Sequence, residues 1–321
     1  MSGWLDVHAH YVTPRYRSEC QLAGHGRPDG MPGMPDWSLE AALDLMGHSG
    51  VAAAVLSVSS PGVHFGDDSL AVNAAARELA HHVNDVGAQI ASDRPATFGF
   101  AAVLPLPDID GALLEVARAY DDIGTDAVAL KTNYHGRYLS DPAFAPVLAE
   151  LDSRAAVVLL HPTSPPAWEV TALGRPRPML EFLFDTTRCV VDLILSGTVE
   201  QYQQIRWVVP HAGAVLPVVA HRVAAIATVT GSAPINVPEV LGTLYYDVAG
   251  MPLPVALPAL LAVVSPRQLL YGSDFPFTPA PVAIALAQAL AQTPELAQAE
   301  FTLAPDVAAS TLFPRLATAQ N

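Results

Sequence analysis

Short runs of apolar and β-branched residues alternate along this chain with longer Ala- and Leu-rich stretches, in which apolar positions recur with a helical period. This alternation is typical of repeated β/α units, which build a parallel sheet covered by helices. The pattern predicts eight strands, at residues 5–8, 53–58, 97–103, 127–131, 157–161, 206–210, 244–248 and 269–272. Eight such strands close a (β/α)8 TIM barrel, which is the fold we expect.

Helices are predicted between the strands, and several begin with a Ser or Asp residue or an early Pro, as helix starts commonly do. Their ranges are 39–48, 69–92, 108–123, 142–153, 178–196, 216–229, 254–263 and 281–292. The chain contains no internal repeat and no low-complexity tail, so we expect a single barrel domain over residues 1–321.

Residues 11–36 interrupt this alternation after the first strand. The segment is rich in Gly and Pro, as at Gly24, Pro28 and Gly30. A connection of this length is more often an active-site lid or an oligomer contact than a spacer, and a disordered loop is the alternative.

The composition indicates a folded enzyme and excludes several kinds of binding partner. Apolar residues make up 51% of the chain and charged residues 15%, which indicates a compact folded enzyme rather than a disordered chain. The net charge of -15, with only 16 Lys and Arg residues, argues against a nucleic-acid partner. Every long apolar stretch is broken before it could cross a bilayer, so we expect no membrane partner. Two distant cysteines and an N-terminus unlike a secretory signal favour a cytoplasmic protein.

Ligand-type residues follow several of the predicted strands. His8 and His10 are two residues apart, so on a strand both imidazoles project to the same side and can bind one metal ion. His161, His211 and Asp274 each end or follow another strand. Because chemistry in such barrels occurs at the carboxyl ends of the strands, these five side chains are the candidate site.

Lys131 is the only lysine in the chain, and it ends the fourth predicted strand. Three interpretations remain open: its ammonium pairs with a carboxylate at the barrel mouth, it holds a substrate carboxylate, or it is carboxylated and bridges two metal ions. Tyr134, His135 and Arg137 follow in a polar, aromatic loop suited to covering an aromatic acid. The histidines outside the candidate site are expected to be mostly solvated; they are His25, His48, His64, His81, His82, His135 and His221.

These motifs together resemble the amidohydrolase superfamily, and within it the branch of the aminocarboxymuconate-semialdehyde decarboxylases. The resemblance rests on motifs that occur in the expected order over nearly the whole chain, namely His8-x-His10, His161-Pro162, His211-Ala212-Gly213 and Gly272-Ser273-Asp274-Phe275-Pro276. Residues 130–142 and 161–165 are similar to 6-methylsalicylate decarboxylases. The muconate enzyme has an additional arginine in the first helix, which this chain lacks around residues 38–41. Muconate semialdehyde is therefore a poor candidate substrate.

The resemblance implies one divalent ion, Zn or Mn, held by four residues, with His211 beside it as an acid/base. The implied ligands are His8, His10, His161 and Asp274. It further implies a homodimer, in which Arg222 reaches the neighbouring subunit's site to hold the substrate carboxylate; an ordinary helix arginine is the alternative. The expected substrate contacts are Arg222, Lys131, Tyr134 and Phe277.

The predicted function is non-oxidative decarboxylation of an ortho-hydroxybenzoate such as 6-methylsalicylate, with Asp274 delivering a proton to the ring carbon. The alternative is a hydrolase of the lactonase or phosphotriesterase type, with two metal ions bridged by a carboxylated Lys131. A non-catalytic binding barrel is the third class, and it predicts no tightly bound metal.

Overall fold

The computed structural model describes residues 3–231, 236–293 and 306–318. Its main sheet has eight parallel strands in the order β1-β2-β3-β4-β7-β8-β9-β10. They span Trp4–His10, Val51–Ser57, Phe98–Val103, Ala127–Lys131, Val157–His161, Arg206–Val209, Tyr245–Asp247 and Leu269–Leu270. The first strand meets the last through a bridge between Asp6 and Tyr271, where the Val7 N–H donates to the Tyr271 carbonyl at 3.0 Å. The predicted (β/α)8 barrel is therefore confirmed.

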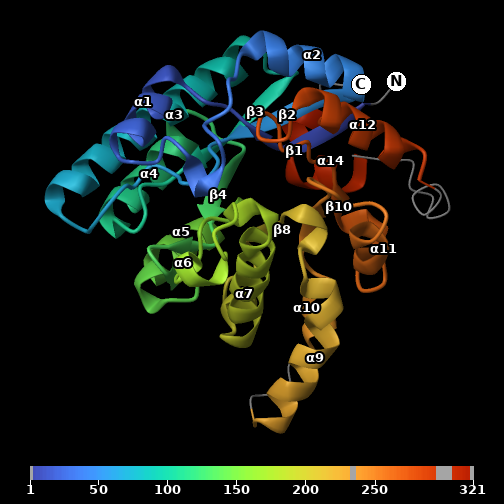
Figure 1. The fold of residues 1–321 in the computed structure, drawn as a ribbon. Coiled ribbons are helices and arrows are strands. Elements are labelled where there is room, and N and C mark those ends of the chain that lie inside the picture. The colour runs from blue at the N-terminus through green and yellow to red at the C-terminus, as the bar shows by residue number, and fades with distance from the viewer. Residues whose placement is uncertain (1–2, 232–235, 294–305, 319–321) are drawn as a thin grey trace.

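Helices surround the strands, and α9 projects away from the ring (Figure 1). The helices after successive strands are α2 Leu39–Ser49, α3 Leu70–Asp93, α4 Ile109–Asp121, α5 Ala145–Ser153, α7 Glu181–Leu195, α9 Leu216–Val229, α11 Ala256–Leu261 and α12 Ala280–Ala291. Shorter helices are α6 Trp168–Thr171, α8 Thr198–Gln201 and α10 Val237–Leu241. Side chains of Ser38, Ser69 and Asp108 cap α2, α3 and α4 by accepting a backbone N–H. None of the described helices is long and apolar enough to cross a membrane.

The segment 11–36 is structured rather than a plain loop. It contains α1 Pro14–Leu22, which begins after Thr13, whose hydroxyl accepts the Tyr16 N–H. Arg17 then fixes the return of the chain by donating to the carbonyls of Met34 and Pro35, each at 2.7 Å. The sequence pattern did not predict α1, because the helix buries only Tyr16 and Cys20 and has no apolar stripe.

A small antiparallel hairpin leaves the barrel after β4. Its strands are β5 Asn133–Tyr134 and β6 Arg137–Tyr138, and its turn at His135 and Gly136 has positive φ angles of 52° and 83°. The buried carboxylate of Asp185 on α7 anchors the hairpin by accepting from Asn133 at 2.9 Å and from the Tyr138 hydroxyl at 2.5 Å.

The amino-terminal end of the barrel is closed by α14 Asp306–Leu312 and α15 Pro314–Thr318. Phe313 and Leu316 are buried and pack with the small residues of the barrel interior, such as Ala53 and Ala127. Arg315 donates to the Phe98 carbonyl and to the carboxylate of Asp126, which lie at the starts of β3 and β4. The opposite, carboxyl-terminal end therefore remains available for a site.

Substituting Phe313→Ala is expected to lower the free energy of unfolding by about 3–5 kcal/mol, because it removes a buried ring and leaves a cavity. Urea denaturation monitored by circular dichroism measures the change. Leu114→Ala is the control, since Leu114 is 65% exposed and its removal should cost about 0.5 kcal/mol or less. Equal effects of the two substitutions would show that Phe313 contributes little to closing the barrel.

Candidate metal centre

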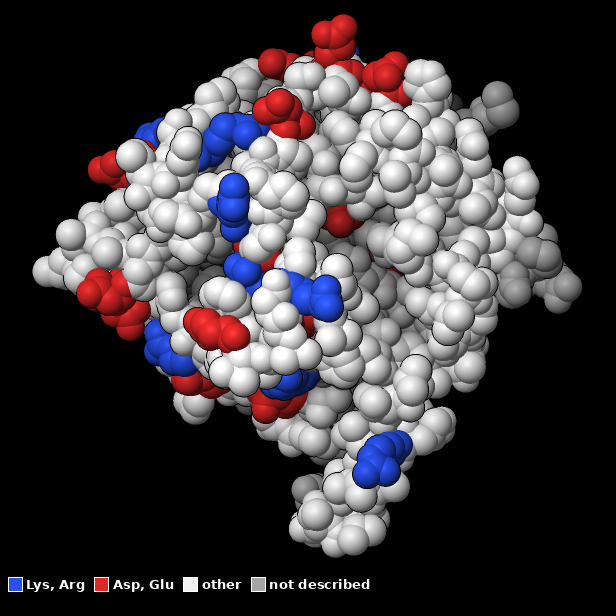
Figure 2. Space-filling model, viewed as in Figure 1, with Lys and Arg blue, Asp and Glu red and all other residues white. Residues whose placement is uncertain are grey.

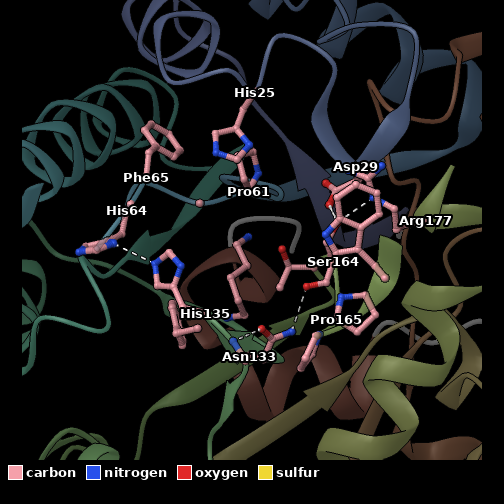
Figure 3. A pocket seen from close by; sticks show the side chains of 18 of the residues that line it. His25, Asp29, Pro61, His64, Phe65, Asn133, His135, Ser164, Pro165 and Arg177 are labelled. Carbon is pink, nitrogen blue, oxygen red and sulfur yellow. Dashed lines mark hydrogen bonds between the residues drawn. The ribbon is translucent and has the colours of Figure 1, made fainter. Parts of the chain in front are cut away.

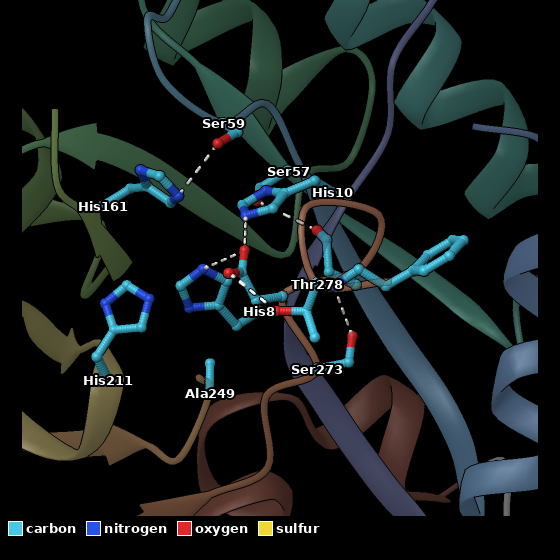
Figure 4. Close-up of polar contacts among 12 residues, drawn as sticks. His8, His10, Ser57, Ser59, His161, His211, Ala249, Ser273 and Thr278 are labelled. Atoms are coloured by element: carbon cyan, nitrogen blue, oxygen red, sulfur yellow. Dashed lines mark hydrogen bonds and ion pairs between the residues drawn. The ribbon is translucent and has the colours of Figure 1, made fainter. Parts of the chain in front are cut away.

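Four predicted ligand residues meet at the carboxyl end of the barrel, and Figure 4 shows the three histidines among them. His8 and His10 lie on β1, His161 is the last residue of β7, and Asp274 follows β10. One ligand atom from each residue lies within 4.8 Å of all the others. The Oδ1 atom of Asp274 is 3.6 Å from Nε2 of His8 and 3.3 Å from Nε2 of His10.

The three imidazoles are buried, and two of their inward nitrogens are unsatisfied. Nε2 of His8 and Nε2 of His10 have no hydrogen-bond partner among the described residues. Leaving buried polar atoms without a partner costs about 1–3 kcal/mol each, which a metal ion at the centre of the cluster would offset. Three imidazoles and one carboxylate are ligands that suit both Zn and Mn. The residues present therefore fit a divalent cation.

The outward ring nitrogens are each held in place. His8 Nδ1–H donates to Asp247 Oδ2 at 2.8 Å, and His161 Nδ1–H donates to the Pro162 carbonyl at 2.7 Å. Ser57 gives its own proton to the Ala9 carbonyl, so its oxygen accepts from His10 Nδ1–H at 3.0 Å. These outward bonds use the proton on Nδ1, so Nε2 is the nitrogen of each ring that faces the centre, and it can bind a cation once it carries no proton.

Asp247 is a site residue that the sequence analysis missed. Besides His8, its carboxylate accepts the backbone N–H groups of His211 and Ala249, each at 3.0 Å through Oδ1. It ends β9, so its signal was a carboxylate at the end of a predicted strand, like the other candidates. One buried carboxylate thus positions both a candidate ligand and the segment that carries His211.

The electrostatics of the cluster follow from burial and close charges. Burial lowers the pKa of His10 to about 4 and also lowers the pKa of His211, which keeps these imidazoles neutral. Burial would also lower the pKa of His8, but the Asp247 carboxylate outweighs it and raises that pKa to about 9. For Asp274, burial opposes ionisation, yet the close contact with His10 and the nearby imidazoles hold its pKa below the usual value.

A pocket of about 490 Å³ opens above the cluster and is lined by His161, His211 and Asp274. The ring centroids of His211 and His8 are 5.1 Å apart. Nδ1 of His211 has no hydrogen-bond partner within the described chain. Phe277 lines the same pocket and packs edge-to-face with His10, with 5.5 Å between the ring centroids. Figure 2 shows a hollow near the middle of the face turned toward the viewer, with atoms of acidic residues inside it.

Three other predicted contacts lie away from this pocket. Lys131 and Tyr134 line a neighbouring cavity of about 680 Å³. Lys131 is buried there and donates from Nζ to the Val58 carbonyl at 2.8 Å, and no ion pair found among the described residues includes it. Burial lowers its pKa to about 7. Arg222 is exposed on α9 and lines neither space.

His64 does not follow the expectation that the remaining histidines are solvated. It is buried, its Nε2–H donates to Asn73 Oδ1 at 2.9 Å, and its Nδ1 accepts from His135 Nε2–H at 3.0 Å. The reason is tertiary: the segment after β2 folds against the tip of the β5–β6 hairpin, a contact that no local pattern specifies.

The fold and the cluster together define a metal-binding (β/α)8 barrel with its candidate centre at the carboxyl ends of the strands. Residues 5–304 match the family model described as Amidohydrolase, and the chain belongs to this amidohydrolase family.

Individual relatives agree with this assignment. A 6-methylsalicylic acid decarboxylase of Penicillium expansum is 34% identical to the chain, covering 97% of this chain and 96% of that protein. A solved structure of an amidohydrolase II is 36% identical, with a TM-score of 0.86, and covers 93% of this chain and 96% of that one. The fold is also that of 5-carboxyvanillate decarboxylase from Novosphingobium aromaticivorans, solved with manganese and 4-hydroxy-3-methoxy-5-nitrobenzoic acid. That structure is 18% identical, with a TM-score of 0.83, and the match covers 97% of this chain and 96% of that one.

Substituting Asp247→Asn is expected to weaken metal binding by about 10–100-fold, because His8 loses the charged acceptor that orients its ring. Competition with a chromogenic chelator measures the Kd for Zn and Mn. Asp44→Asn, at an exposed position on α2, is the control and should leave the Kd unchanged. An unaltered Kd in Asp247→Asn, with the fold retained by circular dichroism, would contradict this role.

Proposed function

We propose that the chain catalyses metal-dependent, non-oxidative decarboxylation of an ortho-hydroxybenzoate, with 6-methylsalicylate as the first substrate to test. The observation that carries the proposal is the buried cluster of three imidazoles and one carboxylate at the base of a pocket. The activity is that of a relative aligned over nearly the full length of both chains.

We propose one Zn or Mn ion as the cofactor, held by His8, His10, His161 and Asp274. When bound, the ion supplies a Lewis acid for the phenolic and carboxylate oxygens of the substrate. The neutral state of His10 and the outward hydrogen bonds of all three rings prepare the protein for this ion.

Asp274 is proposed to carry the proton. Its low pKa leaves it ionised, so it takes the proton of the ortho-hydroxyl as the substrate enters and returns it to the ring carbon that bears the carboxylate. The carbon–carbon bond then breaks, its electron pair restores the aromatic ring, and carbon dioxide leaves. The phenolate regains a proton from solvent, which balances the reaction. His211, neutral and on the wall of the pocket, is proposed to assist this transfer.

The lining of the pocket favours a substrate with apolar ring substituents. The apolar surface beside the cluster comes from Met179, Phe182, Leu183 and Phe277. A methyl group placed against them buries apolar area, which is worth about 0.8 kcal/mol per carbon. Phe277 is therefore proposed as a direct substrate contact.

A homodimer is proposed because no Lys or Arg appears among the described residues that line the metal pocket. Exposed apolar side chains on α9 and near α11, among them Val218, Val229 and Met251, form a surface suited to association. The surface over α11 and α12 in Figure 2 is almost free of charged side chains. We propose that Arg222, on the projecting α9, reaches the partner's pocket and pairs with the substrate carboxylate.

We favour this function over binuclear hydrolysis, which needs a carboxylated Lys131 among the metal ligands. Lys131 borders the separate cavity rather than the metal pocket, and Tyr134 borders that cavity too. Cys20 and Cys189 are both buried and free, and on this basis we propose a reducing, cytoplasmic location.

The variant His8→Ala/His10→Ala is expected to keep its fold but to lose bound metal and carbon dioxide release, because strand-end side chains at the barrel mouth serve the site more than the core. Elemental analysis and release of carbon dioxide from 6-methylsalicylate measure both losses. Chelation of the native protein should abolish turnover, and added Zn or Mn should restore it. His48→Ala, at an exposed position on α2, is the matched control. Turnover in the metal-free protein would overturn the proposal.

Arg222→Ala is expected to lower kcat/KM by about tenfold or more, because a hydrogen bond to a charged group is worth about 1.5–3 kcal/mol. Mixing Arg222→Ala with His8→Ala/His10→Ala should restore part of the activity, since a mixed dimer contains one site with an intact metal centre and the partner's arginine. Arg267→Ala, which removes an exposed arginine elsewhere, is the control. No recovery on mixing would indicate that Arg222 does not act across an interface.

A further inference from the structure

The cavity that contains Lys131 is distinct from the metal pocket. It lies between the segment after β2, the β5–β6 hairpin and the segment after β7, and its volume of about 680 Å³ exceeds that of the metal pocket. Figure 3 shows His25 and the His64–His135 pair on one side of it, with Asp29, Ser164 and Arg177 on the other. Asp29 borders both spaces, and it forms part of the wall between them.

Lys131 is poorly satisfied for a buried ammonium group. An ammonium has three N–H donors, and Nζ uses one of them on the Val58 carbonyl at 2.8 Å. The side chain is only 2% exposed, and it lines the cavity. Gly62 packs along its stem, where an added Cβ would lie 3.5 Å from the lysine Cε. An anion that enters the cavity stabilises the charged form of such a buried amine.

The fixed charges around the cavity favour the same kind of ligand. Arg27 and Arg177 add positive charge, against the carboxylates of Asp29 and Glu169. Asp29 is engaged by the Ser164 hydroxyl, which donates to its Oδ1 at 2.5 Å. The cavity therefore has a net positive lining in a chain whose net charge is -15.

The rest of the lining is apolar or aromatic. Phe65, Leu104 and Leu106 contribute to the walls, and Trp168 lies beneath the Arg177 guanidinium at 4.0 Å from the ring centroid. Inorganic anions gain nothing from such walls, whereas an organic acid buries its carbon skeleton against them.

We propose that this cavity is a second binding site, separate from the metal pocket, for a small organic carboxylate, and that the Lys131 ammonium is the charge partner of its carboxylate group. The proposal does not depend on the decarboxylase assignment, because it concerns a space without a metal ligand.

The single lysine allows a direct test. Protein labelled with 13C at the lysine Cε gives one side-chain resonance, which reports on Lys131 alone. The probe is benzoate, which has a carboxylate on a ring but lacks the ortho-hydroxyl group. In the full-length His8→Ala/His10→Ala variant, where the metal centre is removed, benzoate is expected to shift this resonance in a saturable way.

A second measurement uses 4-fluorobenzoate, followed by 19F NMR. Its Kd should be similar in the native chain and in His8→Ala/His10→Ala, and weaker by about tenfold or more in Lys131→Met, which corresponds to about 1.4 kcal/mol. Lys131→Arg, which keeps the positive charge, should retain more of the affinity than Lys131→Met.

Three results would overturn the proposal. The first is an unchanged lysine resonance at saturating benzoate, which needs no substitution of Lys131 and so does not depend on the folding of a variant. The second is binding that Lys131→Met leaves intact but His8→Ala/His10→Ala abolishes, which would assign the carboxylate to the metal pocket alone. The third is an equal response to chloride or bicarbonate, which would mean that the site takes any anion.

Discussion

The carboxylate of Asp247 is the interaction on which the candidate centre depends. It is buried and ionised, a state that is costly unless hydrogen-bond donors surround it. Three donors do so: the His8 imidazole and the backbone N–H groups of His211 and Ala249. These groups are far apart in the sequence. His8 lies on β1, whereas His211 and Ala249 follow β8 and β9, so the Asp247 carboxylate aligns β1 with the segments after β8 and β9.

This arrangement also explains an unusual backbone. His211 and Ala212 both have positive φ angles, of 57° and 52°, which disfavour residues with a side chain. The hydrogen bond from the His211 N–H to Asp247 stabilises the chain at this point and turns the imidazole toward the pocket. Strained geometry of this kind is common at functional sites, where the surrounding structure offsets its cost.

Much of the fold and of the metal cluster could be predicted from the sequence, because both depend on local patterns. Strands and helices of a barrel follow hydrophobic periodicity, and parallel strands bring His8, His10, His161 and Asp274 to one end. Asp247 lies at the end of a predicted strand, as the other candidates do, but its role was not predicted because its partners lie 36 and 239 positions away in the sequence. The placement of Lys131 beside a separate cavity, and the contact of His64 with the hairpin, depend on how loops pack, which periodicity does not encode.

The barrel is closed by residues that are synthesised long after β1, and this order affects how the chain folds. β1 is completed by contact with residues around Tyr271, and the interior is sealed by Phe313 and Leu316. A nascent chain cannot make these contacts until Tyr271, Phe313 and Leu316 have left the ribosome. Until then one edge of β1 stays unpaired, and an unpaired strand edge is a place where a chaperone can protect the growing chain from aggregation.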